Sequence, residues 1–343
     1  MMKAFIMAAG AGTRLRPLTF AIPKPMVPVV NKPALEHTLE NLKRHGIHQV
    51  MMNLHHYPET IKNYFGDGSA FGMKISYSYE KELMGTAGGV KRTESFFDTT
   101  FLVMSGDGLT DIDLNMALNF HRQRKSMATM VLKAVDSKFE YGVTLTEKNG
   151  RIRKFIEKPR WSDVFANTVN TGIYILEPEV FNYIPKNKFY DFGLQLWPDL
   201  LKRRKRIFGY LMSEYWTDVG NLTEYKRGVR DALDGKLKLD IPGEQVRPGI
   251  WIGKGTRIEK GAKLKPPCVI GRYCFIGNNA IINQYTTIGN HSRIGKGANI
   301  KNSILWERVN VSKNVNLDSC IIGYKAKVLE DISVYEGTVI SIE

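Results

Sequence analysis

MAAGAGTRLRPLT occupies residues 7–19 of this chain, and PKPMVP follows at residues 23–28. The apolar residues 5–8 predict a buried strand. Gly10 and Gly12 then predict a turn whose backbone N–H groups can approach a phosphate closely. Arg14 and Lys24 add two cations a short loop apart, which favours a polyphosphate over a single phosphate.

The familiar glycine-loop motifs do not describe this stretch. Residues 10–15 have the first two glycines of a dinucleotide-binding fingerprint but Leu15 where the third should stand. The nearest approach to a phosphate-binding P-loop is residues 249–254, which has the wrong spacing and Gly255 after its lysine. The glycine spacing alone therefore does not distinguish this stretch from other phosphate-binding loops. The whole string, with its proline-flanked lysine, does.

Residues 1 to about 234 alternate short apolar runs with stretches of helical period. The leucines at positions 35, 39 and 42 share one helical face. Leu114, Leu118 and His121 begin a second helical stretch, and residues 194–201 form a third. This alternation predicts an α/β domain with a Rossmann-like, mostly parallel sheet, in which ligands bind beyond the carboxyl ends of the strands. The predicted strands are residues 5–8, 50–54, 75–79, 101–104, 128–134 and 172–176.

The second half has a six-residue period. An aliphatic residue recurs at every sixth position from Ile252 to Ile300. After a one-residue slip the period continues through residues 305, 311 and 317, and after a second slip through residues 322, 328, 334 and 340. Such hexads, with glycines in the turns, predict a left-handed parallel β-helix of roughly five coils, with the slips at coil corners.

The two periods divide the chain into predicted domains. We expect a catalytic domain at residues 1–234, a Gly- and Pro-marked linker at 235–249 and the β-helix at 250–343. With 343 residues, each half is long enough for its own hydrophobic core.

The composition indicates the cellular compartment and the charge of the ligands. The three cysteines form no C-x-x-C pair, and no apolar stretch approaches the length of a membrane span, so we expect a cytoplasmic protein. The net charge of +15 favours anionic ligands. The basic run at residues 202–206 is interpreted as a solvated helix C-terminus, where cations suit the helix dipole. We expect no nucleic-acid or membrane partner.

Further motifs follow in order along the first half. They are LMGTAGGV at 83–90, VMSGD at 103–107, EYGV at 140–143, EKP at 157–159, VNTGIY at 169–174 and WTDVG at 216–220. Together with residues 7–28, they resemble the sugar-1-phosphate nucleotidylyltransferases, many of which carry a hexapeptide-repeat tail. The string PKPMVPVVNKPALEH at 23–37 is most similar to the mannose-1-phosphate guanylyltransferase branch.

The chemistry that this resemblance implies is simple in its demands. A phosphate oxygen of the sugar 1-phosphate attacks the α-phosphorus of a nucleoside triphosphate, and pyrophosphate leaves. The nucleophile is already anionic at neutral pH, because the second pKa of a phosphate monoester is about 6. No activated serine or cysteine is required, so catalysis reduces to positioning and charge neutralisation.

The resemblance assigns the charged residues of this reaction. Arg14 is expected to hold the β- and γ-phosphates, and Lys24 to reach the α-phosphate. Asp107 and Asp218 are expected to bind Mg²⁺ through carboxylate oxygens.

The nucleotide and the sugar phosphate have separate expected binding residues. The glycine loops would hold the nucleotide through Ala9, Gly10, Ala11, Gly12, Thr13, Gly85 and Thr86. The base edge would be read by Glu80, with Glu82 as the alternative, because a carboxylate accepts both N–H donors of guanine. The sugar phosphate would contact Tyr141, Gly142, Glu157, Lys158, Asn170 and Thr171.

The sequence thus predicts an enzyme that makes GDP-mannose from GTP and mannose 1-phosphate. A glucose-1-phosphate uridylyl- or thymidylyltransferase and a non-catalytic regulatory subunit of the same fold remain alternatives. A homo-oligomer assembled through the β-helix is expected, with Trp251, Trp306 and Tyr324 as contact residues. An acetyltransferase role for His291 is not expected, because no arm follows the last coil to complete an acyl-CoA site.

Overall fold

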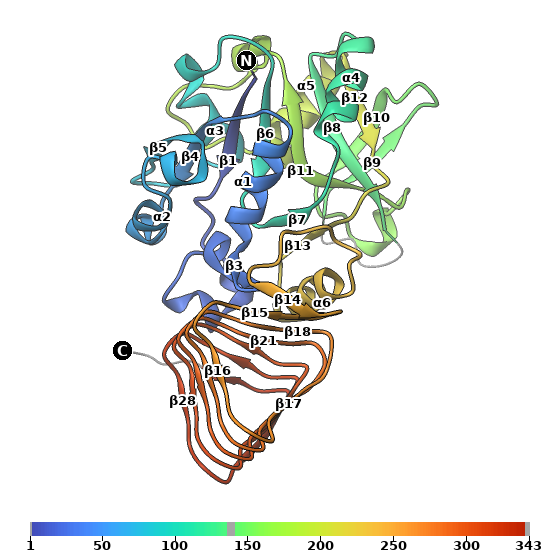
Figure 1. Cartoon of the computed structure of the whole chain (residues 1–343). Helices are drawn as coiled ribbons and strands as arrows, with labels where there is room; N and C mark the ends of the chain where they lie inside the picture. The colour runs from blue at the N-terminus through green and yellow to red at the C-terminus, as the bar shows by residue number, and fades with distance from the viewer. Residues whose placement is uncertain (1, 136–140, 340–343) are drawn as a thin grey trace. The chain divides into compact units, whose positions relative to one another are not determined.

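The structure is a computed structural model that describes residues 2–135 and 141–339, so Glu140 and Ile340 of the predicted motifs lie outside it. The chain divides into two compact units (Figure 1). The first comprises Met1–Ala11, Pro23–Pro25 and Thr38–Thr217, and the second comprises Gly12–Ile22, Met26–His37 and Asp218–Glu343. The predicted boundaries at 234 and 250 stay a prediction. The glycine loop itself begins in one unit and continues in the other.

The first unit is built on a nine-stranded sheet in the described part of the chain, with the path β10-β9-β11-β6-β1-β4-β5 and β8 and β12 branching from β11. Its strands are β1 (Lys3–Met7), β4 (Gln49–Leu54), β5 (Lys74–Tyr79), β6 (Phe101–Ser105), β8 (Ala128–Ala134), β9 (Val143–Thr146), β10 (Ile152–Ile156), β11 (Thr168–Leu176) and β12 (Ile207–Leu211). A small second sheet pairs β7 (Gly108–Thr110) with β13 (Trp216–Asp218).

The predicted parallel sheet is confirmed where it carries the glycine loop. Strands β6, β1, β4 and β5 run parallel to one another. Strand β11 is antiparallel to both β6 and β8, an arrangement that the sequence pattern did not indicate. Because the four parallel strands point the same way, Ala8, Glu80 and Asp107 all follow strand ends at one edge of the sheet. This edge is where an open α/β sheet binds its ligands.

Helices cover this sheet, and side chains fix several of their ends. They are α2 (Pro58–Phe65), α3 (Thr86–Lys91), α4 (Leu114–Gln123) and α5 (Trp197–Lys202), while α1 (Ala34–Arg44) spans the division between the units. Asp113 caps α4 by accepting hydrogen bonds from the backbone N–H groups of Asn115 and Met116. Among the described residues, no helix is both long and apolar enough to cross a membrane.

The second unit contains a parallel β-helix, as the six-residue period predicts. Before it come the hairpin of β2 (Pro28–Val29) and β3 (Lys32–Pro33), helix α6 (Leu222–Leu233) and strand β14 (Glu244–Arg247). One sheet of the β-helix contains β15 (Ile250–Ile252), β18 (Cys268–Ile270), β21 (Thr286–Ile288), β24 (Ile304–Leu305), β27 (Ile321–Ile322) and β30 (Thr338–Val339). The second contains β16 (Arg257–Ile258), β19 (Phe275–Ile276), β22 (Arg293–Ile294), β25 (Asn310–Val311) and β28 (Lys327–Val328). The third contains β17 (Lys263–Leu264), β20 (Ile281–Ile282), β23 (Asn299–Lys301), β26 (Asn316–Asp318) and β29 (Ser333–Tyr335).

The two predicted slips lie at coil corners. Ile270 pairs with Ile288, eighteen positions on, whereas Ile288 pairs with Leu305, seventeen positions on. Asn302 and Ser319 form the shortened corners with positive φ angles of 48° and 60°. The inward aliphatic residues remain stacked through both slips, so the hydrophobic core of the β-helix is continuous.

Two details of the second unit differ from expectation. The predicted linker includes strand β14, which pairs antiparallel with β15. Trp306 is buried, and its indole N–H donates to the Tyr225 hydroxyl at 3.0 Å, so the prediction of Trp306 as an exposed contact residue is wrong. Its polar group is used inside the unit, as is usual for buried tryptophan.

Candidate functional site

A buried amide and carboxylate organise the start of the first glycine loop. The backbone N–H of Ala8 donates to Oδ1 of Asn53 at 2.8 Å, and Nδ2 of Asn53 donates to Oε1 of Glu80 at 2.8 Å. The other carboxylate oxygen of Glu80 accepts from the backbone N–H of Met84 at 3.0 Å. Glu80 therefore connects the first glycine loop to the second.

Glu80 is almost fully buried, with 1% of its surface exposed, whereas Glu82 is exposed. A carboxylate can accept about four hydrogen bonds, so the two protein donors leave it capacity for two more. The base-reading role expected of Glu80 remains a prediction. The structure gives Glu80 a role in positioning the loop that the sequence did not indicate.

The second glycine loop is held by residues 190–192. Gly85 has a φ of 74°, and a Cβ at this position would lie 2.6 Å from the carbonyl oxygen of Tyr190, so only glycine fits. The Thr86 hydroxyl donates to Oδ2 of Asp191 at 2.7 Å and accepts from the backbone N–H of Phe192. The loop is thus fixed on a segment far away in the sequence.

Asp107 and Lys24 form a half-buried ion pair beyond the end of β6. The Ser105 hydroxyl also donates to the Asp107 carboxylate. Burial opposes ionisation, but the Lys24 ammonium and the Ser105 hydroxyl outweigh it and hold the pKa of Asp107 below its ordinary value. Asp107 is therefore ionised at neutral pH.

Glu157 lies in a contrasting environment just after β10. A Cβ on Gly142 would lie 2.7 Å from Oε2 of Glu157, and one on Gly193 would clash with the same oxygen. Burial raises the pKa of the Glu157 carboxyl; the charge of Lys158 opposes this and that of Asp191 adds to it. Two glycines from separate segments thus leave just enough room for this carboxyl group.

The remaining residues of the expected sugar set meet around β11. The backbone N–H of Asn170 donates to the Gly142 carbonyl, and its side-chain Nδ2 lies 2.8 Å from the Tyr174 hydroxyl. The Thr171 hydroxyl donates to the Val131 carbonyl, and Trp216 donates to the carbonyl of Thr171. The ring of Tyr141 packs edge-on against Trp216, with centroids 5.1 Å apart. Asn170, Gly142 and Glu157 are therefore brought together, while the Thr171 side chain serves the sheet.

Arg14 and Asp218 belong to the second unit. Gly12 begins the turn at residues 13–15 with a φ of 62°, and its carbonyl accepts a hydrogen bond from the Thr19 hydroxyl at 2.8 Å. Leu15 and Leu18 are buried, which anchors the loop and leaves Thr13 and Arg14 exposed. Asp218 ends β13, and a Cβ on Gly220 would lie 2.7 Å from its Oδ1.

Each of the two aspartates expected to bind magnesium, Asp107 in the first unit and Asp218 in the second, has a side chain suited to that cation. Asp107 is ionised, and Asp107 and Asp218 both offer carboxylate oxygens, the ligands that this cation prefers. No group of three or more His, Cys, Asp or Glu side chains suited to a metal occurs in the part of the chain that the structure describes.

Comparison with known proteins identifies the family. Residues 3–235 match the nucleotidyl transferase family, and residues 247–343 match the left-handed β-helix domain of the EIF2B epsilon subunit. The chain belongs to the nucleotidyl transferase family and carries a C-terminal left-handed β-helix. The resemblance predicted from the motifs and the predicted fold class are both confirmed.

Individual relatives differ in the substrates that their names state. A UTP–glucose-1-phosphate uridylyltransferase from Synechocystis sp. is 42% identical over 267 residues, or 74% of this chain and 69% of that protein. A mannose-1-phosphate guanylyltransferase from Mycobacterium tuberculosis is 34% identical over 234 residues, or 68% of this chain and 65% of that protein. The matched region thus spans about two thirds of these relatives.

Among solved structures, a protein from Bacillus anthracis described as a glucose-1-phosphate thymidylyltransferase, in complex with sucrose, is similar with a TM-score of 0.62. The identity is 25%, and the match covers 70% of this chain and 98% of that one.

Sequence reasoning missed three residues that organise the site: Asn53, Asp191 and Gly193. Asp191 caps the helical turn that follows it by accepting from the backbone N–H of Gly193. An aspartate just before a helical stretch is a recognisable N-cap signal, so this residue could have been found. Nothing in the sequence around Asn53 or Gly193 indicates the distant carboxylates that they contact.

Proposed function

We propose that this chain transfers a nucleotidyl group from a nucleoside triphosphate to a sugar 1-phosphate and releases pyrophosphate. The observation that carries the proposal is the half-buried Lys24–Asp107 ion pair at the sheet edge that also carries the glycine loop. A lysine and an ionised carboxylate at this edge suit a reaction that needs charge neutralisation.

The residues divide the task. The backbone of residues 9–13 and 85–86 binds the nucleotide phosphates, Arg14 stabilises the departing pyrophosphate and Lys24 binds the α-phosphate. Asp107 and Asp218 would hold Mg²⁺, which supplies further neutralisation of phosphate charge when bound. Lys158 and the backbone of Tyr141 and Gly142 bind the sugar phosphate, with Glu157, Asn170 and Thr171 toward the sugar.

For the substrates we propose GTP and mannose 1-phosphate. The supporting observation is Glu80, an acceptor-only carboxylate held four residues before Met84 and the second glycine loop. Guanine offers two N–H donors on one edge, which a carboxylate can accept together. UTP and glucose 1-phosphate form the second candidate pair, favoured by the 42% identity to the Synechocystis enzyme.

Pyrophosphate release tests both proposals. The full chain is assayed with Mg²⁺ and each of GTP, UTP, TTP, ATP and CTP, crossed with mannose 1-phosphate and glucose 1-phosphate. We expect turnover with GTP and mannose 1-phosphate, and relaxed preference for GTP in Glu80→Gln. Turnover with another pair keeps the reaction and overturns the substrates. Folded protein that turns over no pair would favour the regulatory-subunit alternative.

Oligomeric state and cellular compartment are also part of the proposal. The β-helix is proposed to form homo-oligomer contacts, and the enzyme is proposed to act in the cytoplasm. Size-exclusion chromatography with light scattering measures the oligomeric state directly.

A further inference from the structure

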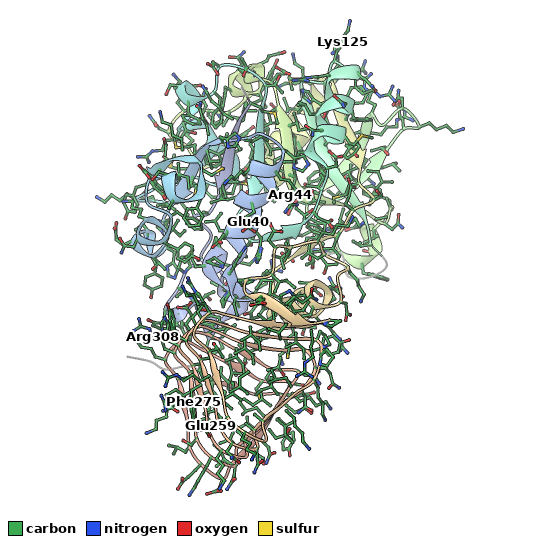
Figure 2. All side chains as sticks on the ribbon, in the orientation of Figure 1. Glu40, Arg44, Lys125, Glu259, Phe275 and Arg308 are labelled. Atoms are coloured by element: carbon green, nitrogen blue, oxygen red, sulfur yellow. The ribbon has the colours of Figure 1, made fainter. Side chains whose placement is uncertain are left out.

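Three basic segments that are far apart in the sequence converge at one end of the first unit. They are residues 122–125 at the end of α4, residues 151–154 at the start of β10 and residues 202–206 between α5 and β12. Labels α4, α5, β12 and β10 stand together at the upper right of Figure 1, and Figure 2 shows Lys125 at the outer tip of this end. We call these three segments the basic end.

Hydrogen bonds connect the three segments. The backbone N–H of Met127 donates to the Arg206 carbonyl at 3.0 Å, and Nη2 of Arg151 donates to the Arg204 carbonyl at 3.3 Å. The rings of Phe120 on α4 and Phe208 on β12 pack edge-on, with their centroids 6.5 Å apart. The convergence is therefore a fixed property of the folded unit.

Most of these cations lack an acidic partner. Arg153, Arg203 and Lys205 pair with Glu147, Asp199 and Glu179. The others are exposed and form no ion pair with a carboxylate among the described residues; they are Arg122, Arg124, Lys125, Arg151, Lys154, Lys202, Arg204 and Arg206. The basic end thus concentrates uncompensated positive charge.

Two of the cations stand where the backbone favours another residue. Lys125 and Arg204 follow the ends of α4 and α5 with φ angles of 45° and 52°. This left-handed position after a helix is usually glycine, which adopts it without strain. The sequence therefore keeps charge at two sites where local conformational preference alone would favour glycine.

Although no membrane partner is expected from the sequence, we propose that the basic end docks the protein on an anionic phospholipid bilayer. Most of the cations are exposed and lie at helix ends, in turns or at the start of β10. Several long flexible side chains can therefore contact a layer of phosphate headgroups together. Clusters of this size bind anionic lipid by electrostatics alone.

Nucleic acid fits less well. None of the large exposed apolar or aromatic side chains belongs to the three segments, in the part of the chain that the structure describes. Base stacking and deep insertion into the bilayer are therefore not part of the proposal.

Vesicle co-sedimentation of the full chain tests this docking. We expect binding to phosphatidylcholine vesicles that contain about one third phosphatidylglycerol, weaker binding as salt rises, and no binding to pure phosphatidylcholine. The variant Lys125→Gly/Arg204→Gly should bind roughly tenfold or more weakly. Because glycine suits both positions, its melting temperature should be unchanged or higher and its turnover unchanged.

A matched control lies in the β-helix. Lys325 and Arg308 also have positive φ angles, of 57° and 58°, so Lys325→Gly/Arg308→Gly removes the same charges from the same backbone conformation. Arg308 is labelled in Figure 2. We expect this control to bind the anionic vesicles as the wild type does. The proposal would be overturned if both variants lost vesicle binding equally, or if the wild type did not bind the anionic vesicles. It would also be overturned if duplex DNA displaced the protein from vesicles at a phosphate concentration below that of the anionic lipid.

Discussion

Two half-buried carboxyl groups of the first unit, Asp107 and Glu157, differ in the charge that surrounds them. Asp107 pairs with Lys24 and accepts from Ser105, and its pKa is lowered. Glu157 lies against two glycines, and its pKa is raised. The two environments favour different protonation states: the surroundings of Asp107 stabilise its negative charge, whereas those of Glu157 disfavour it. The proposed roles follow this difference, with Asp107 at the phosphates and Glu157 toward the sugar.

The largest expected effect is on turnover when the fixed charge is removed. Asp107→Asn keeps the size of the side chain but removes its charge, so we expect kcat to fall by about 10²–10³-fold. Ser105→Ala is the control, because it removes only the hydroxyl donor to the same carboxylate and should reduce kcat by a few-fold. Steady-state pyrophosphate release measures both. A near-wild-type kcat in Asp107→Asn would contradict the proposal that the negative charge of Asp107 is needed for turnover.

A smaller effect is expected when the space around Glu157 is filled. Gly193→Ala places a methyl group against the Glu157 carboxylate, so we expect the KM for sugar 1-phosphate to rise about tenfold while the KM for the nucleotide changes little. Gly108→Ala is the matched control next to Asp107, where the nearest atom to an added Cβ is 3.8 Å away. Equal KM values in the two variants would contradict the shaping role of Gly193.

The stability of Glu157→Gln should depend on pH in one direction. The native state binds the Glu157 proton more tightly than the unfolded chain, so this carboxyl group destabilises the wild type increasingly as pH rises from its ordinary pKa of 4.5 through the raised native value. Glu157→Gln cannot ionise and therefore lacks this pH-dependent destabilisation. Its melting temperature relative to the wild type should therefore increase across that window. A constant difference would show that the pKa is not raised.

The smallest effect is the opposite pH dependence at Asp107. Its stabilising contribution is fully present above the ordinary pKa of 3.8 and is lost as pH falls through the lowered native value. Asp107→Asn should lack this acid-side loss, so the curves of wild type and variant should converge below pH 3.8. Melting temperatures recorded from neutral to acid pH test this sign; parallel curves would contradict it.

Sequence reasoning predicted the β-helix well because its pattern is local. Each inward residue, such as Ile288 or Ile300, recurs at a fixed spacing, and the turn glycines carry the same period. Six strands of the nine-stranded sheet were also located from their apolar runs, whereas β9, β10 and β12 were not predicted. The antiparallel pairing of β11 was missed, because pairing between distant strands leaves no periodic signal in the sequence.

The candidate site was predicted in residue type more than in arrangement. The motifs identified Asp107 and Lys24 singly, while their ion pair joins residues far apart in the chain. Glu80 was singled out for the base, but its contact with Asn53 depends on the packing of β4 beside β5. Contacts of this kind are fixed by tertiary structure, so a motif alone cannot reveal them.

The most direct test of nucleotidyl transfer is the fate of the nucleotide's phosphates. The full chain is incubated with Mg²⁺, mannose 1-phosphate and GTP labelled at either the α- or the γ-phosphate, and the products are separated. We expect the α-label in a nucleotide sugar and the γ-label in pyrophosphate. Transfer of the γ-label to the sugar phosphate would contradict the account, and so would absence of labelled nucleotide sugar with every nucleotide and sugar phosphate tested.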